Sequence, residues 1–353
     1  MPPPFKAIGS IPAAILPFFE DFSIDEASFR AHLTDLAGTS GVTAITVNGH
    51  ASEVASCTFD EQARVLAVAV SEVGKRVPLV CGVYTESSME GARIAKMAEA
   101  GGASALLVFP PALLTMGQRD DMVLGHFRHI AAASPLPLIV FQYPLGPGQG
   151  YRLELLQRLC DEVPSIVAIK DWSADPQLHE RHIRTLQSRA RPVNVLSTHS
   201  AWLFPSLVLG CRGLLSGAGS VIAGLQAELL AACEDNDLAR ARAVHERIYP
   251  LSEVFYCAPW VDMHNRMKEA LVMLGKLPRN VVRPPLMPLS GEEKVRIRNA
   301  LIASGLLPTA TASFKTRDPS SVAGCTDYKG PVLSTDNMQD AIRKGIAERH
   351  AHR

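Results

Sequence analysis

Short apolar segments rich in β-branched residues recur along the first 217 residues of the chain. Segments of this length, bounded by polar residues, are typical of buried strands and are too short for most helices. The sequence therefore predicts eight strands. They are AAILPFF (13–19), AITV (44–47), PLVCG (78–82), ALLVF (105–109), LIVFQ (138–142), IVAIK (166–170), VNVLS (193–197) and GLLS (213–216).

Segments of mixed polarity separate these strands, whose starts lie about 20 to 35 residues apart. Residues 60–75 and 88–102 have helical patterns, and the second ends in Gly-Gly, a common helix stop. Strands that alternate with helices form parallel βαβ units. Eight such units predict an α/β fold, a closed (β/α)8 TIM barrel over residues 1–220, with a doubly wound open sheet as the structural alternative.

Beyond residue 220 the strand pattern stops and helical patterns follow. We expect a C-terminal helical appendage over 221–307, with its helices separated in part by the proline-rich segment 277–290. From Pro308 the composition becomes polar, so 308–353 is predicted to be an arm with a short helix at 337–349. The helices predicted in the appendage are 221–233, 237–254, 260–274 and 290–304.

Composition narrows the class of protein. The 353 residues are 47% hydrophobic and include 35 basic and 35 acidic side chains, so nothing indicates a nucleic-acid partner. No apolar stretch is long enough for a membrane helix, and the N-terminus lacks the pattern of a secretory signal. Seven scattered cysteines without a CxxC pair suggest reduced thiols. We expect a cytoplasmic enzyme with no cofactor and no metal ion.

The segment SIVAIKDWSAD (165–175) holds the most informative residue, Lys170. In a barrel the chemistry lies where strands end, and Lys170 ends an apolar strand. Burial lowers the pKa of a lysine, and a neutral amine can attack a carbonyl carbon to form a Schiff base. The alternatives are that Lys170 pairs with Asp171 or extends to solvent.

Other polar residues follow the predicted strands, so they would share one rim of the barrel with Lys170. Tyr143 and His50 are candidates for proton transfer, although each could instead have a structural role. Glu53 is expected to brace the next helix. Candidates for substrate binding include small residues that let a carboxylate approach the backbone. These candidates are Ala51, Ser52, Phe141, Ser197, His199, Ser216 and Gly217.

Four segments, 41–70, 140–144, 167–175 and 282–293, resemble the dihydrodipicolinate synthase / N-acetylneuraminate lyase superfamily in order and spacing. The resemblance covers roughly residues 6 to 307. It implies a Schiff-base aldolase barrel with a three-helix C-terminal region, usually tetrameric, that acts on pyruvate or another 2-keto acid. The Schiff-base lysine of that superfamily falls on Lys170.

The chain departs from the superfamily pattern around this lysine. The glycine–threonine–threonine–glycine–glutamate loop reads GHASE (49–53), and the catalytic tyrosine position is Phe141. The synthase's inter-subunit tyrosines are replaced by Pro110-Pro111-Ala112, and its arginine after the fifth strand has no counterpart. These departures indicate a substrate other than that of lysine biosynthesis, handled through the same imine.

The sequence therefore predicts a lyase that forms an imine between Lys170 and a 2-keto acid and makes or breaks a carbon–carbon bond. Tyr143 or His50 would transfer the proton, and the backbone near Ala51, Ser52 and Gly217 would hold the carboxylate. A dehydratase or deaminase of a 2-keto-3-deoxy sugar acid would use the same imine. The pattern is also compatible with a keto-acid-binding barrel without activity, and with a barrel enzyme that does not use an imine. A homo-oligomer, a tetramer or dimer, is expected.

Overall fold

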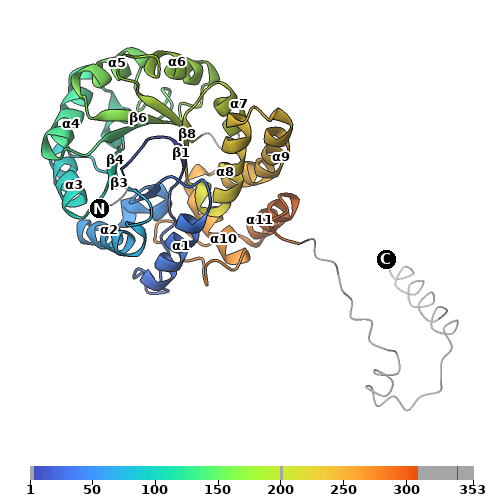
Figure 1. Ribbon diagram of the computed structural model, residues 1–353. Coiled ribbons are helices and arrows are strands. Elements are labelled where there is room, and N and C mark those ends of the chain that lie inside the picture. Colours follow the sequence, from blue (N-terminus) through green and yellow to red (C-terminus); the bar gives the residue numbers. More distant parts are fainter. Residues whose placement is uncertain (1–3, 199–201, 309–339, 341–353) are drawn as a thin grey trace, which may run out of the picture. The chain divides into compact units, whose positions relative to one another are not determined.

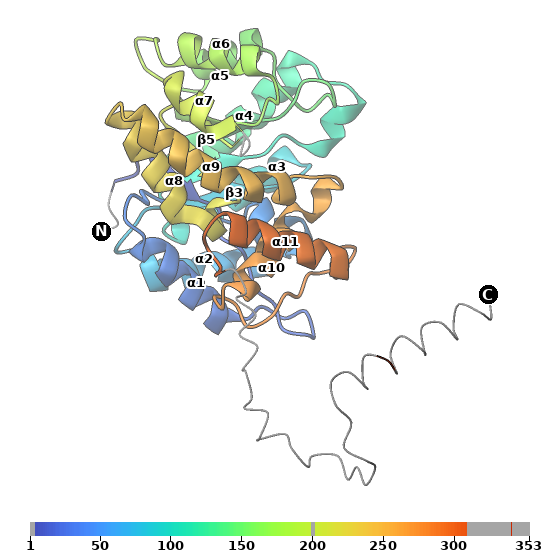
Figure 2. The same cartoon turned by 90° about the vertical axis from the view of Figure 1, so that its right-hand side faces the viewer.

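The computed structural model describes residues 4–198, 202–308 and 340 (Figures 1 and 2). The chain divides into two compact units, Met1–Pro308 and Thr309–Arg353. The predicted short helix at 337–349 lies outside the described residues apart from Asp340, and so does nearly all of the predicted polar arm at 308–353. The division of the first unit at residue 220 stays a prediction.

Eight parallel strands form a sheet in the order β1-β8-β7-β6-β5-β4-β3-β2. Parallel bridges from Ser10 to Val42 and from Ala13 to Thr46 bring the first strand against the second, so the sheet closes on itself (Figure 1). The predicted (β/α)8 barrel is confirmed. The strands are β1 (Gly9–Pro12), β2 (Ile45–Val47), β3 (Leu79–Val83), β4 (Ala105–Val108), β5 (Leu138–Gln142), β6 (Ile166–Asp171), β7 (Asn194–Ser197) and β8 (Gly213–Ser216).

Helices surround the barrel, and local sequence explains where they begin. Thr58 and Glu61 form a reciprocal capping box before α2, while Asp175 caps α6, which has proline in its first turn. The barrel helices are α1 (Glu26–Gly38), α2 (Phe59–Val73), α3 (Ser88–Ala100), α4 (Asp120–Ala133), α5 (Leu153–Glu162), α6 (Pro176–Leu186), α7 (Leu203–Val208) and α8 (Gly219–Glu234).

The C-terminal helices pack on one side of the barrel, where α9 contacts α8 and α11 contacts both α9 and α10 (Figure 2). Their apolar side chains form a cluster with α8 that is separate from the barrel interior. These helices are α9 (Leu238–Phe255), α10 (Met263–Met273) and α11 (Gly291–Ala303). Short 3-10 turns are η1 (His50–Ser52), η2 (Val54–Ser56), η3 (Ala112–Met116) and η5 (Trp260–Asp262).

The first predicted strand was wrong. The strand is Gly9–Pro12, and the apolar run 13–19 follows it at the end of the barrel. Alternate residues of this run enter two different apolar clusters, with Leu16 and Phe18 in one and Ile15 in the other. Pro17 also has no N–H to donate to a neighbouring strand. The apolar pattern thus indicated burial correctly, but the burial comes from packing on both sides of a loop.

An irregularity in β6 decides which of its side chains enter the barrel. Leu138 pairs with Ile166, but the next residue of β5, Ile139, pairs with Ala168, so Val167 is an extra residue. As a result Ile166 and Ile169 face the helices, whereas Ala168 packs with the barrel interior. Strand alternation then places Lys170 on the inner face.

A buried ion pair joins the loop after β2 to the C-terminal helices. Lys268 of α10 donates to Glu53 Oε1 at 2.5 Å and to the Val281 carbonyl at 2.7 Å. Glu53 Oε2 accepts from the Arg283 backbone N–H at 2.9 Å. Burial lowers the pKa of Lys268, and the Glu53 charge opposes that shift. Glu53 is therefore a brace, as expected, but it braces the C-terminal region and not the following helix.

Replacing Glu53 with Ala should lower the free energy of unfolding by about 3 kcal/mol, because Lys268 is left buried without its counter-charge. Urea unfolding measures this difference. Glu90→Ala is the control, since its partner Arg93 is 57% exposed in the side chain and such pairs contribute about 0.5 kcal/mol. An equal decrease in the free energy of unfolding of both variants would contradict the role assigned to Glu53.

Candidate active site

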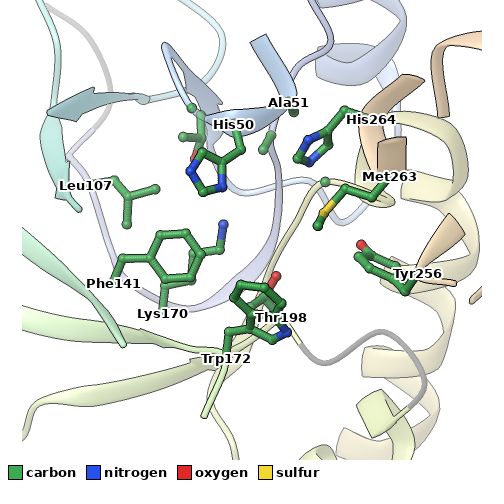
Figure 3. A pocket seen from close by; sticks show the side chains of 14 residues that line it. His50, Ala51, Leu107, Phe141, Lys170, Trp172, Thr198, Tyr256, Met263 and His264 are labelled. Carbon is green, nitrogen blue, oxygen red and sulfur yellow. The ribbon is translucent and has the colours of Figure 1, made fainter. Parts of the chain in front are cut away.

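A small cavity of about 30 Å³ lies at the carboxyl ends of the strands (Figure 3). Residues from several strand ends and from α10 converge on it, as barrel topology requires. Among its lining residues are Thr46, His50, Ala51, Phe141, Lys170, Trp172, Thr198, Gly217, Tyr256, Met263 and His264. Five of the residues predicted to form the site are therefore together here: Lys170, His50, Ala51, Phe141 and Gly217.

Lys170 enters this cavity from β6 and is only 6% exposed. Its Nζ lies 4.0 Å from the centre of the Phe141 ring, which is its register partner on β5. Within the described part of the chain, Lys170 has no ion-pair partner. Burial lowers the pKa of the Lys170 amine to about 7. A substantial fraction of the amine is then neutral near pH 7.

The alternative pairing of Lys170 with Asp171 is wrong, because consecutive residues of a strand point to opposite faces. Asp171 Oδ2 accepts from His179 Nδ1 at 2.8 Å and from His182 Nδ1 at 2.7 Å, behind the barrel wall. Burial alone would raise the pKa of Asp171, but the hydrogen bonds from these histidines hold it well below its usual range. The cluster ties β6 to α6 and keeps the carboxylate away from the amine.

Tyr143 and His50 form a pair beside Lys170. Tyr143 Oη and His50 Nε2 lie 3.1 Å apart, so a neutral phenol can donate to a neutral imidazole. Burial raises the pKa of Tyr143, and burial together with the Lys170 charge lowers the pKa of His50 to about 3. His50 lines the cavity, whereas Tyr143 is not among its lining residues and reaches it through His50. The two residues proposed as alternatives for proton transfer are thus in contact.

His264, from α10, is a cavity residue that the sequence analysis missed. A Cβ atom on Gly217 would lie 2.7 Å from His264 Nε2, so the close approach depends on glycine at that position. The ring centroids of His264 and His50 are 6.3 Å apart. Burial, and then electrostatic repulsion from the protonated forms of His50, Lys170 and Lys268, keep the pKa of His264 well below its usual value. No motif near His264 indicated that the appendage reaches the site.

Thr198 and Trp172 also line the cavity and were not among the predicted site residues. Trp172 could have been found from the sequence, because side chains alternate between the two faces of a strand. Ala168, Lys170 and Trp172 are two residues apart and therefore share the inner face. Thr46, a buried β2 residue, lines the cavity as well, and its hydroxyl has no hydrogen-bond partner among the described residues.

Three serines predicted to bind substrate point elsewhere. The Ser52 hydroxyl donates to the Ala14 carbonyl at 2.9 Å, and its backbone N–H donates to Gly49. The Ser197 hydroxyl donates to Ser206 Oγ at 3.0 Å. Ser216 is next to Leu215, which packs in the barrel interior, so alternation turns Ser216 outward. His199 lies outside the described residues.

No cluster of three or more His, Cys, Asp or Glu side chains suited to a metal ion occurs within residues 4–198, 202–308 and 340. His179 and His182 donate to Asp171 instead. In the same residues, no helix is long and apolar enough to cross a membrane.

Replacing Lys170 with Met should stabilise the protein at pH 7 by about 2–4 kcal/mol. The pKa of Lys170 falls from 10.5 to about 7 on folding, so between these values the unfolded chain binds more protons. The wild-type protein should therefore gain stability as pH rises from 7 to 10.5. The difference in unfolding free energy between the variant and the wild type should shrink over the same range.

Urea unfolding at a series of pH values measures this difference. Lys276→Met is the control, because Lys276 is 40% exposed in the side chain. An advantage of Lys170→Met that stays constant between pH 7 and 10.5 would contradict the assigned pKa.

Comparisons with known proteins agree with this fold. The model of the dihydrodipicolinate synthetase family matches residues 6–304. A 4-hydroxy-tetrahydrodipicolinate synthase from Bartonella henselae is 30% identical over 299 residues, which cover 85% of this chain and 98% of that protein. The synthase from Sphingopyxis alaskensis is 29% identical, with 85% and 99% covered.

Solved structures of the same family are similar. A prophage protein of the dihydrodipicolinic acid synthase family from Escherichia coli K12, in complex with pyruvate, has a TM-score of 0.79 and 25% identity, covering 86% of this chain and 100% of that one. Dihydrodipicolinate synthase from Aquifex aeolicus has a TM-score of 0.77 and 25% identity, with 85% and 98% covered. The chain therefore belongs to the dihydrodipicolinate synthetase family, as a divergent aldolase-type lyase.

Proposed function

We propose that Lys170 forms a Schiff base with a 2-keto acid, pyruvate being the simplest, and that the protein makes or cleaves a carbon–carbon bond next to it. The observation that carries this proposal is a buried amine, with a pKa of about 7 and no ion-pair partner among the described residues, at a barrel strand end. The similar prophage protein is in complex with pyruvate, which supports a keto acid as the ligand.

The steps use the groups around the cavity. The neutral Lys170 amine adds to the keto carbon, and loss of water leaves a protonated imine. The imine withdraws electrons, so the adjacent carbon releases a proton to the Tyr143–His50 pair and an enamine forms. The enamine carbon attacks an aldehyde, and the pair returns the proton to the new alkoxide. Cleavage is the same sequence in reverse.

The carboxylate of the keto acid would be held opposite Lys170. Ala51 and Gly217 bring backbone to the cavity wall, and both have little or no side chain to obstruct a ligand. Thr46 adds a buried hydroxyl that has no hydrogen-bond partner among the described residues. A buried polar group in this situation is suited to bind a ligand oxygen. Ser52 is less suited, since its hydroxyl and its N–H are both engaged.

A dehydratase or deaminase of a 2-keto-3-deoxy sugar acid would use the same imine. A polyhydroxylated chain needs hydrogen-bond partners along its length, and the space beyond the imine site has mostly apolar walls. This favours the aldol reaction. A barrel that only binds keto acids would show saturable binding without any product. A homo-oligomeric assembly and a cytoplasmic location remain expectations.

Borohydride reduction in the presence of pyruvate should attach the reduced keto acid to Lys170. Mass spectrometry of the digested protein locates the adduct. The trapping rate should rise as pH increases through about 7, because the neutral fraction of the amine rises there. Lys170→Met should give no adduct, whereas Lys276→Met should react like the wild type. Labelling confined to other lysines would exclude this function.

Tyr143→Phe should lower kcat about a hundredfold or more, because the phenol can no longer exchange a proton with His50. Pyruvate trapping should persist, since the amine is unchanged. Tyr151→Phe makes the same substitution at a fully buried tyrosine whose hydroxyl has no hydrogen-bond partner among the described residues, and should leave kcat within about twofold. Steady-state kinetics compare the variants. A Tyr143→Phe enzyme as active as Tyr151→Phe would remove Tyr143 from the mechanism.

A further inference from the structure

A second, larger pocket continues outward from the cavity around Lys170. Its volume is about 430 Å³, against about 30 Å³ for the inner cavity. His50, Trp172, Met263 and His264 line both spaces, so the two are continuous. A keto acid bound to Lys170 is larger than the inner cavity and would extend toward this outer pocket, where the molecule that reacts with it must also lie. The walls of the outer pocket therefore determine which molecule that is.

Apolar and aromatic side chains make up most of these walls. The ring centroids of Trp172 and Trp260 lie 5.6 Å apart, at the inner and outer parts of the pocket. Trp260 is 51% exposed and Val261 is 66% exposed, although both are large apolar residues. Pro284 and Leu286 continue the apolar lining. An apolar ligand would cover this surface and remove it from water, which favours binding.

The charged groups of the outer pocket are already paired. Of its described lining residues, Glu53 and Arg283 carry charge. Glu53 binds Lys268 and the Arg283 backbone N–H. The Arg283 guanidinium donates to both oxygens of Glu61, at 2.5 and 2.9 Å, and to the Phe22 carbonyl at 2.7 Å. The Arg283 guanidinium is thus not free to neutralise a ligand carboxylate or phosphate, Glu53 would repel such a ligand, and both histidines of the pocket are neutral near pH 7.

We propose that the outer pocket receives an uncharged aromatic group, carried by the aldehyde that reacts with the keto acid on Lys170. This proposal rests on the Schiff-base function proposed above. A benzene ring occupies a cavity of about 150 Å³. The pocket therefore has room for one aromatic ring or a fused pair, with tryptophan rings on its walls to stack against it.

The reaction balances with groups already described. The enamine carbon bonds to the aldehyde carbon, and the π electrons of the aldehyde move to its oxygen. That oxygen takes the proton which the Tyr143–His50 pair had removed from the keto acid. Water then hydrolyses the imine and replaces the water lost when it formed. The product is a 4-aryl-4-hydroxy-2-keto acid, the sum of the two substrates, and no oxidant or reductant is needed.

The test incubates the full chain with pyruvate and one of three aldehydes. Benzaldehyde is aromatic and uncharged, glyceraldehyde is hydroxylated, and succinic semialdehyde carries a carboxylate. Mass spectrometry follows the formation of each adduct of pyruvate and aldehyde. We expect kcat/KM for benzaldehyde to be at least tenfold higher than for the other two. A preference for the hydroxylated or the charged aldehyde would overturn the proposal.

Variants of Trp260 test whether the aromatic group lies against the outer wall of the pocket. Trp260→Ala should raise KM for benzaldehyde about tenfold, the effect of removing one apolar wall, and Trp260→Phe should restore most of the loss. Met116→Ala is the control, because Met116 is apolar and 88% exposed but lies outside the pocket. An unchanged KM in Trp260→Ala would contradict the placement of the aromatic group.

Borohydride trapping with pyruvate alone separates the two proposals. Adduct formation on Lys170 is measured in the wild type and in the control variant Met116→Ala, where the rates should be equal. If the adduct forms but benzaldehyde gives no product, only the aromatic aldehyde is excluded. If no adduct forms with pyruvate or another 2-keto acid, the Schiff-base function fails and the aromatic aldehyde fails with it.

Discussion

The site depends on one constraint, which is that Lys170 is buried inside the barrel with no counter-charge among the described residues. Burial shifts its pKa to about 7, whereas a carboxylate beside it would restore the charged form. The nearest acidic residue in sequence is Asp171, and strand geometry turns it to the opposite face. There His179 and His182 hold it by hydrogen bonds. The extra residue Val167 in β6 sets this orientation.

The rest of the site is arranged to avoid charge near the amine. His50 and His264 face the same cavity, and burial keeps both neutral at ordinary pH. The Phe141 ring covers Lys170 where the superfamily pattern has a tyrosine. Because a tyrosine two residues further along the chain contacts His50, a phenol remains within reach of the cavity. The imine chemistry proposed for Lys170 therefore still has a phenol to move its proton.

The C-terminal helices are part of the site and not only an addition to the barrel. They supply His264 to the inner cavity and Trp260 to the outer pocket, and the Glu53–Lys268 ion pair attaches them to the loop that carries His50. The Arg283 guanidinium, the charge of the outer pocket that could have bound an acidic substrate, is instead held by Glu61 in the first turn of α2. Under the proposed function, the contact that attaches the C-terminal region to α2 also removes this charge from substrate binding.

The sequence was sufficient to predict the barrel, because strands and helices have local apolar patterns. It was also sufficient to predict Lys170 as a site residue, because the lysine ends an apolar strand. It placed the first strand at 13–19, since apolar pattern reports burial and not hydrogen bonding. It assigned Ser197 and Ser216 to the site because they end strands, although alternation turns them outward. His264 could not be found in this way. Its approach to Gly217 arises from packing between segments distant in sequence, and no local pattern records that packing.

The central claim, that burial lowers the pKa of the Lys170 amine to about 7, can be measured directly. A 13C NMR titration of protein labelled at the lysine Cε atoms reports each amine, and Lys170→Arg assigns the resonance. We predict one resonance that titrates near pH 7 and is absent from the variant. A Lys170 resonance that titrates near its ordinary value of 10.5 would contradict the account.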